Sequence, residues 1–264
     1  MKHPIIAVLL FLIISNLQAQ EDTSKLEIDK FINRFNSKMD TVFWLCEYDN
    51  IAWWTSDKVS ASSEAEQAKL GPQWFCFKQD DLWHAAYGKF TDGQYDLVFH
   101  YTVDSSARIK RIHIEIDTFT TNSFCRSLIK GSDLLSQYLD GANVNFNPYI
   151  QRNKDSTISV WYMPAFTQNG TAVYGGEFYY LFDASGNHVL SKSEKSYGYK
   201  GFKPDRKAEI WLDYSFVDEP TLGAVFFVWY YRTYFDRIII DAKNYKSSVF
   251  HNNSGYYWVH AKKN

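Results

Sequence analysis

The stretch from Trp74 to Asp117 constrains the fold more than any other part of the chain. Four runs rich in aromatic and β-branched residues follow one another there, separated by short turn signals: WFCFKQ, LWHAAYGKF, YDLVFHYTV and RIKRIHIEID. Such residues favour strands, and short polar turns join antiparallel neighbours. The pattern therefore predicts a four-stranded antiparallel β-meander.

Side chains alternate between the two faces of a strand, so the turns decide which residues share a face. Three residue pairs flank the turns and set the register: Gln79–Leu82, Phe90–Tyr95 and Val103–Arg108. The first face collects Phe75, Phe77, Leu82, His84, Ala86, Phe90, Tyr95, Leu97, Phe99, Tyr101, Ile112, Ile114 and Ile116. The second face collects Cys76, Lys78, Trp83, Tyr87, Lys89, Asp96, Val98, His100, Arg111, His113, Glu115 and Asp117. The first face is apolar and must be covered, whereas the mixed second face suits contact with water.

A helical pattern precedes the meander. One apolar stripe recurs at helical spacing and consists of Ile28, Phe31, Ile32, Phe35, Met39, Val42, Phe43 and Cys46. Residues 22–24 can cap the start of a helix of about five turns. We expect this helix to cover the apolar face of the meander, with Phe31, Phe35 and Met39 buried deepest. Lys38 is expected on the opposite, solvent-facing side.

The rest of the chain predicts further helices and strands. The run Ile51–Trp54 is expected to be buried, residues 60–70 to form a short polar helix, and residues 120–139 another helix. Residues 221–235 follow a good helix start and would form a helix apolar nearly all round, with a strand as the rival interpretation. Residues 197–207 are expected to form an exposed loop. Strands are expected at 144–151, 157–163, 172–182, 189–195, 208–216, 237–241, 247–251 and 256–261.

These elements indicate an α+β fold: an antiparallel meander sheet covered by a long N-terminal helix, with a second β-rich half that could extend the sheet. The segment Ala85–Phe90 resembles Ala172–Phe178 with one inserted residue, which hints at related halves, 20–141 and 142–264. We expect residues 20–264 to form a single mature domain.

The first residues look like an export signal. Lys2 and His3 precede an apolar run over 5–14, and Ala19 offers a cleavage position, so residues 1–19 fit a signal peptide. The run is too short to span a bilayer, and no later segment is a better membrane span. The mature protein is therefore expected to be exported and soluble, in the periplasm or outside the cell.

Composition narrows the classes of partner. The formal net charge of −2 argues against nucleic acid, which would favour a basic surface. Aromatic residues make up 18% of the chain, so the fold is rich in strands, or a binding face is made of rings. Cys46, Cys76 and Cys125 form neither a disulfide framework nor a metal-binding spacing, and we expect small buried hydrophobic side chains. No cofactor is expected.

A metal site is one hypothesis for the second face. His113, Glu115 and Asp117 share that face with His100 on the neighbouring strand, and imidazoles with carboxylates can ligate a divalent metal. Spacing by two along a strand keeps neighbouring Cα atoms about 6.6 Å apart, so further ligands would have to converge. Arg111 would compete for the carboxylates. A solvated face is the simpler interpretation.

Catalytic candidates are few. His84 could act as a base at the mouth of an aromatic pocket, together with Glu47 from the first helix, although a satisfied core histidine is the alternative. Glu177 follows Gly175 and Gly176 in a strand, where glycines mark a bulge; it could contact a ligand or occupy an exposed strand position. The chain contains no G-x-S-x-G, H-E-x-x-H, Walker or dinucleotide-binding glycine motif.

The candidate ligand-binding residues are Trp83, Tyr87 and His100 on the second face of the meander. The sequence favours a non-catalytic exported domain that binds through an aromatic sheet face or a helix–sheet cleft. Its partner would be a small molecule, glycan, peptide or lipid. The alternatives are an extracytoplasmic hydrolase with His/Glu acid–base groups, and a scaffold or interaction protein.

Overall fold

The computed structural model describes residues 4–139, 144–167, 169–203 and 208–263, with side chains from residue 26 onward. The helices are α1 (Pro4–Ser60), α2 (Glu64–Gln67), α3 (Thr118–Ser136) and α4 (Leu222–Tyr231). The first eight strands are β1 (Trp74–Gln79), β2 (Leu82–Thr91), β3 (Gln94–Val103), β4 (Ile109–Ile112), β5 (Phe146–Arg152), β6 (Ile158–Pro164), β7 (Ala172–Phe182) and β8 (Val189–Phe202). The last four are β9 (Glu209–Tyr214), β10 (Arg237–Ala242), β11 (Tyr245–Asn252) and β12 (Gly255–Lys262). This mixed, mostly β architecture confirms the α+β class.

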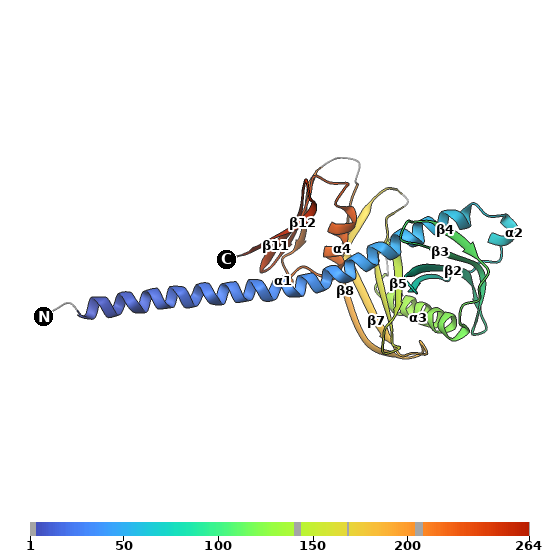
Figure 1. Cartoon of the computed structure of the whole chain (residues 1–264), viewed down its shortest axis with the longest axis horizontal. Coiled ribbons are helices and arrows are strands. Elements are labelled where there is room, and N and C mark those ends of the chain that lie inside the picture. Colours follow the sequence, from blue (N-terminus) through green and yellow to red (C-terminus); the bar gives the residue numbers. More distant parts are fainter. Residues whose placement is uncertain (1–3, 140–143, 168, 204–207, 264) are drawn as a thin grey trace.

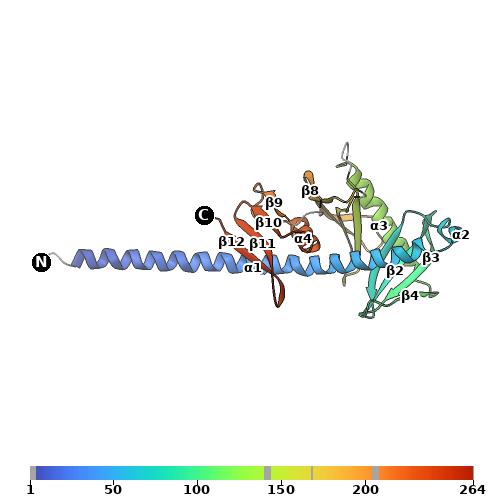
Figure 2. The same cartoon turned by 90° about the horizontal axis from the view of Figure 1, so that it is seen from above.

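The strands form three four-stranded sheets, ordered β1-β2-β3-β4, β5-β6-β7-β8 and β12-β11-β10-β9. Helix α1 runs along all three sheets (Figure 1). Its N-terminal part extends away from the body, and the rest passes first the β9–β12 sheet, then β5–β8, and finally β1–β4 (Figures 1 and 2). The second half of the chain therefore builds its own sheets instead of extending the meander.

Helix α1 is longer than the sequence predicts. Residues 22–24 lie within it and do not begin it, and residues 51–54 continue it to Ser60. The short helix expected at 60–70 is reduced to α2. Capping residues cost only fractions of a kcal/mol inside a helix, so they do not by themselves end one. Trp53 and Trp54 are exposed, contrary to expectation, because the helical period turns Ile51, Ala52 and Thr55 inward instead.

Most of the apolar stripe of α1 is buried as expected, but against a different sheet, and Phe43 is exposed. Phe31 stacks on Tyr245 with ring centroids 3.8 Å apart, and Phe35 packs edge-on against Trp258 at 4.8 Å. Phe31, Phe35 and Met39 are all buried. The middle of the stripe therefore covers β11 and β12 rather than the meander.

The last turns of α1 cover the meander instead. The Cys76 amide on β1 donates to the Tyr48 hydroxyl at 2.9 Å, and the Thr55 and Tyr87 hydroxyls are 2.8 Å apart. Tyr48 also packs edge-on against Trp83. The face that meets α1 is thus the one that carries Cys76, Trp83 and Tyr87, which the sequence assigned to solvent.

The first two turns of the meander match the predicted register. Gln79 pairs with Leu82, and Phe90 pairs with Tyr95. At the third turn Val103 pairs with Ile109 instead of Arg108, a shift of one residue. Arg108 remains in the turn, where its carbonyl accepts from the Asp104 amide.

A β-bulge accounts for the wrong face assignment in β3. Tyr87 pairs with Phe99 but Gly88 pairs with Leu97, so Val98 has no direct partner on β2. A Cβ on Gly88 would lie 2.2 Å from the Asp96 carbonyl oxygen, so this close approach requires glycine. Beyond the bulge every side chain of β3 changes face relative to the prediction.

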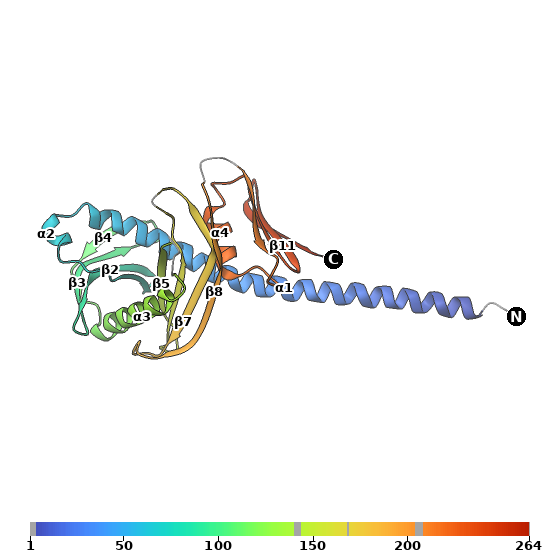
Figure 3. The same ribbon diagram turned by 180° about the vertical axis from the view of Figure 1, so that it is seen from behind.

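Helix α3 covers the opposite face of the meander (Figure 3). Phe124 packs edge-on against Phe75 and Phe77, with ring centroids 5.3 and 6.5 Å apart. Asp117 caps the helix by accepting from the Thr120 amide at 2.8 Å. Both faces of the meander are therefore covered, and neither is an open binding face.

The second sheet, like the first, contains a β-bulge at a glycine. Its register also shifts between Tyr174 and Gly176, and Gly175 has a φ of 105°. This confirms the expected bulge, so the two similar segments each carry a bulge beside their Tyr-Gly step. Strand β8 continues to Phe202, so the first part of the expected 197–207 loop is strand. Residues 204–207 lie outside the described residues.

The third sheet contains α4 between its two parallel strands, β9 and β10. Residues 222–231 are helical, which confirms the preferred interpretation of this apolar run, and most of their side chains are buried. Thr221 caps the helix by accepting from the Ala224 amide. The expected strands at 247–251 and 256–261 are confirmed as β11 and β12, which pair as a hairpin whose turn lies at Asn252–Gly255. Within the described residues, none of the helices combines the length and apolar character needed to cross a membrane.

Candidate functional site

The structure separates Glu47 and His84, which the sequence joined as an acid–base pair. Lys78 lies opposite Trp83 on the face covered by α1, and Lys78 Nζ approaches Glu47 Oε1 to 3.9 Å. His84 lies opposite Phe77, on whose ring it stacks, on the other face. The sheet stands between the imidazole and the carboxylate, so the two groups cannot act on one substrate atom.

The bulge instead brings His84 to His100. Nδ1 of His84 lies 2.9 Å from Nε2 of His100, and Nδ1 of His100 donates to the Ile114 carbonyl at 2.8 Å. Because a carbonyl only accepts, neutral His100 carries its proton on Nδ1, and His84 donates to His100 Nε2. Burial lowers the pKa of both imidazoles, and the adjacent His100 lowers that of His84 further. This geometry matches a satisfied core pair.

The expected metal ligands do not converge. His113 and Glu115 are exposed in the segment between β4 and α3, and Asp117 is occupied as the cap of α3. His100 is buried against His84. In the part of the chain that the structure describes, no three His, Cys, Asp or Glu side chains are grouped to hold a metal ion.

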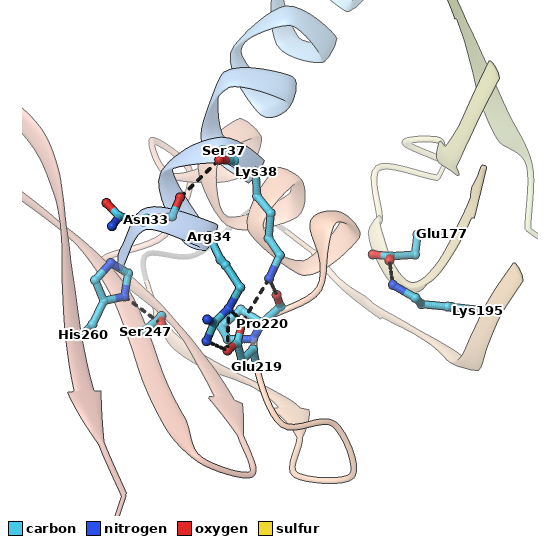
Figure 4. Close-up of polar contacts among 10 residues, drawn as sticks. All are labelled: Asn33, Arg34, Ser37, Lys38, Glu177, Lys195, Glu219, Pro220, Ser247 and His260. Atoms are coloured by element: carbon cyan, nitrogen blue, oxygen red, sulfur yellow. Dashed lines mark hydrogen bonds and ion pairs between the residues drawn. The ribbon is translucent and has the colours of Figure 1, made fainter. Parts of the chain in front are cut away.

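Glu177 is buried, contrary to the exposed position that its strand pattern favoured. Its Oε1 accepts from Lys195 Nζ at 2.5 Å (Figure 4). Its Oε2 accepts from the Gly223 amide in the first turn of α4. A carboxylate is stabilised at a helix N-terminus by the helix dipole and by the unpaired amides. Glu177 therefore joins the second sheet to α4.

A second ionic junction lies nearby on α1 (Figure 4). Arg34 pairs with Glu219, and Lys38 Nζ donates to the Pro220 carbonyl at 2.9 Å and lies 3.6 Å from Glu219 Oε2. Burial lowers the pKa of Lys38, although Glu219 opposes the shift. Lys38 is thus not the solvent-facing residue that the helical stripe predicts, but part of the junction between α1 and the approach to α4.

The three expected ligand-binding residues do not share an open face. Trp83 is buried beneath α1, and His100 lies on the opposite side of the sheet. Tyr87 also lies beneath α1, where its hydroxyl donates to the Ala52 carbonyl at 3.1 Å. One side of Tyr87, however, lines a large hollow, and this hollow is the candidate site.

The cleft has a volume of about 650 Å³ and lies where α1, the first two sheets and α4 meet. Helix α1 contributes Asp49, Asn50, Ala52, Trp53 and Ser56 to its wall, and the strands and α4 contribute most of the rest. Nine of the lining residues are aromatic: Trp53, Trp74, Tyr87, Tyr149, Phe166, Phe226, Tyr230, Tyr231 and Tyr234. The hollow is therefore an aromatic helix–sheet cleft, one of the two binding geometries that the sequence favoured.

Asp49 holds the polar centre of the cleft. Its Oδ1 accepts from the Tyr149 hydroxyl at 2.8 Å and from Asn147 Nδ2 at 3.3 Å. Its Oδ2 accepts from the Tyr230 hydroxyl at 2.5 Å. Three donors from β5 and α4 thus fix one carboxylate of α1 in the wall of the cleft.

The phenols around Asp49 keep their protons. Burial, and then the negative charge of Asp49, raise the pKa of Tyr149 and of Tyr230 far above the ordinary value. The same two causes raise the pKa of Tyr231. These hydroxyls are therefore hydrogen-bond donors at every physiological pH, and none of them is a candidate base.

The rim of the cleft carries exposed rings. Trp53 is 69% exposed, Tyr234 51% and Phe166 49%. Exposed large apolar side chains that gather around a hollow mark interaction sites more often than exposed single residues do. A ligand in the cleft would cover these rings.

Neither Asp49 nor the rings of α4 stand out in the sequence as candidate binding residues. Asp49 reads as an ordinary polar position on a helix, and its partners Tyr149 and Tyr230 are 100 and 181 residues away along the chain. The one available signal was the Trp53-Trp54 pair. Two adjacent tryptophans on a helix cannot both face the same core, so at least one has to lie near the surface.

The cysteines lie as expected. Cys76 and Cys125 are buried, Cys46 is half-buried, and all three are free. Burial raises the pKa of the Cys46 thiol to about 12 and that of Cys125 to about 12, so neither is a thiolate near neutral pH.

In comparisons with known proteins, no family model matches the chain, and no curated protein or solved structure matches it.

Proposed function

We propose that this chain is an exported, non-catalytic binding domain whose ligand occupies the aromatic cleft beside α1. The observation that carries the proposal is a cleft of about 650 Å³ with nine aromatic lining residues and a carboxylate held by three donors. Sites for small ligands are concave, mostly apolar and about 300–1,000 Å³ in volume, with a few fixed polar groups. The cleft has each of these properties.

Binding is favoured over hydrolysis by the chemistry of the lining. Acid–base catalysis needs two titrating groups within reach of one substrate atom. Asp49 is the single carboxylate among the described lining residues, and the tyrosines beside it keep their protons. The acid–base candidates of the sequence lie elsewhere: Glu47 and His84 are on opposite sides of the meander, and Glu177 is engaged by Lys195 and α4.

The signal-peptide pattern of residues 1–19 supports export, and an exported protein would meet its ligand in the periplasm or outside the cell. The ligand classes compatible with an aromatic cleft are a small molecule, a glycan, a peptide or a lipid chain. The exposed rings of Trp53, Tyr234 and Phe166 at the rim of the cleft would contact the ligand first.

Tryptophan fluorescence tests the proposal, because Trp53 and Trp74 line the cleft. We expect at least one member of a panel of glycans, peptides, lipids and small organic molecules to change the emission in a saturable way. Trp53→Ala should weaken that response by about tenfold or more, because it removes a large ring from the rim. The matched control is Trp54→Ala, on the same helix but outside the cleft, which should leave affinity unchanged. If Trp53→Ala and Trp54→Ala weaken the fluorescence response equally, the ligand binds outside the cleft.

A further inference from the structure

We propose that the ligand of the aromatic cleft is an organic cation, such as a quaternary ammonium group, with Asp49 as its counter-ion. This inference rests on the proposed function and narrows it to one chemical class. It begins from the charge of Asp49. All three of its hydrogen-bond partners, the hydroxyls of Tyr149 and Tyr230 and the amide of Asn147, can donate to it, and an ionised carboxylate is the form that only accepts.

The cleft supplies no positive charge to balance this carboxylate. Its described lining contains no Lys, Arg or His, and Asp49 forms no salt bridge with any described residue. Other sheltered acids among the described residues do have cationic partners: Glu177 pairs with Lys195, Glu194 with Lys192, and Glu219 with Arg34 and Lys38. Asp49 is therefore balanced only by neutral donors, and a cationic ligand would supply the missing charge.

The rings around Asp49 favour the same ligand class. A cation within about 6 Å of a ring centroid is attracted by the negative face of the ring, most strongly for Trp. Trp74 and Tyr87 stack with centroids 6.2 Å apart, and Tyr230 and Tyr231 lie edge-on at 4.9 Å. Together with Trp53 at the rim, these rings surround the space next to a fixed carboxylate, which is how proteins recognise quaternary ammonium groups.

A neutral sugar fits this lining less well. A sugar needs several directional hydrogen bonds in addition to a ring platform, and a carboxylate offers about four lone-pair positions. Three of those of Asp49 are already taken by Tyr149, Tyr230 and Asn147. The attraction between a charge and Asp49 needs no free lone pair, so the existing hydrogen bonds do not diminish it.

The test compares choline with 3,3-dimethylbutan-1-ol, its neutral isostere of the same shape, by isothermal titration calorimetry with the full-length protein. We expect choline to bind at least about tenfold more tightly, which corresponds to about 1.4 kcal/mol. Asp49→Asn keeps the shape of the side chain and should remove most of this preference. Glu47→Gln, which removes an exposed acid from the same helix, should leave it unchanged.

The comparison within the wild-type protein needs no variant, so a misfolded Asp49→Asn protein would not obscure the result. Equal binding of the two probes would overturn the cation inference and leave the cleft as a binding site. Absence of binding by both would also overturn it, and the fluorescence panel would then decide separately whether the cleft takes a neutral ligand. If the folded Asp49→Asn protein still prefers choline, Asp49 is not the counter-ion of the cation.

Discussion

At the scale of single residues, close backbone approaches decide the shape of two sheets. A Cβ added to Gly175 would lie 2.2 Å from the Gly198 carbonyl oxygen, and Gly175 has a φ of +105°. Gly198 also has a positive φ, of +78°, but a Cβ there would meet no atom within 4 Å. Substitution at Gly198 therefore tests the cost of a left-handed backbone alone, whereas substitution at Gly175 adds the cost of a steric clash.

We expect Gly198→Ala to destabilise the protein by about 1–2 kcal/mol, the cost of the left-handed conformation alone. Gly175→Ala should cost about 1–3 kcal/mol more, because the bulge of β7 must move away from β8. Urea unfolding followed by circular dichroism measures both variants. Equal midpoints would mean that the bulge does not hold the two backbones as close as described.

At the scale of elements, α1 is an integral part of the core and not a detachable arm. Phe35 is buried, and its ring contacts Trp258 and His260 of β12. We expect Phe35→Ala to lose about 3–5 kcal/mol of a total stability of about 5–15 kcal/mol. Asp40→Ala, at an exposed position one turn further along the same helix, should change stability little. Thermal unfolding curves measure the difference, and coincident curves would show that α1 does not pack on the last sheet.

At the scale of the whole molecule, buried and half-buried histidines in two sheets should make the fold sensitive to acid. Burial lowers the pKa of His260 to about 4, and it also lowers the pKa values of His84 and His100. The unfolded chain, whose histidines titrate near about 6.5, therefore binds more protons than the folded chain below that pH. The stability contributed by neutral histidine is present above about pH 6.5 and is lost as the pH falls toward 4.

We expect the melting temperature to fall between about pH 7 and about pH 5. His260→Gln should flatten this dependence, because it removes one of the groups that titrate, although it also removes the bond between His260 and Ser247. His113→Gln, at an exposed position, should leave the slope unchanged. If the melting temperature depends on pH equally in the wild-type protein and both variants, groups other than His260 cause the acid sensitivity.

The sequence by itself determined the local features of this protein. The turns at Asp80-Asp81 and Asp92-Gly93, the buried helix α4 after Asp218-Glu219-Pro220, and the last hairpin all follow from short-range chemistry. Turn residues need particular backbone angles, so neighbours in sequence suffice to predict them. The start of α4 was predicted to within a few residues, although its cap is Thr221 and Pro220 precedes that cap instead of lying in the first turn. The class of the fold followed from the same signals.

Only the tertiary structure decided which faces meet and where a ligand could bind. The bulge at Gly88 moved His100 from the face of Trp83 to that of His84, and one inserted residue is invisible in a pattern of alternating side chains. The packing of α1 on three sheets sent Phe35 to β12 instead of the meander. The cleft needs Asp49 and Tyr230, 181 residues apart, to meet. Such contacts depend on how layers pack, because the free energy of burial is not directional and does not specify a partner.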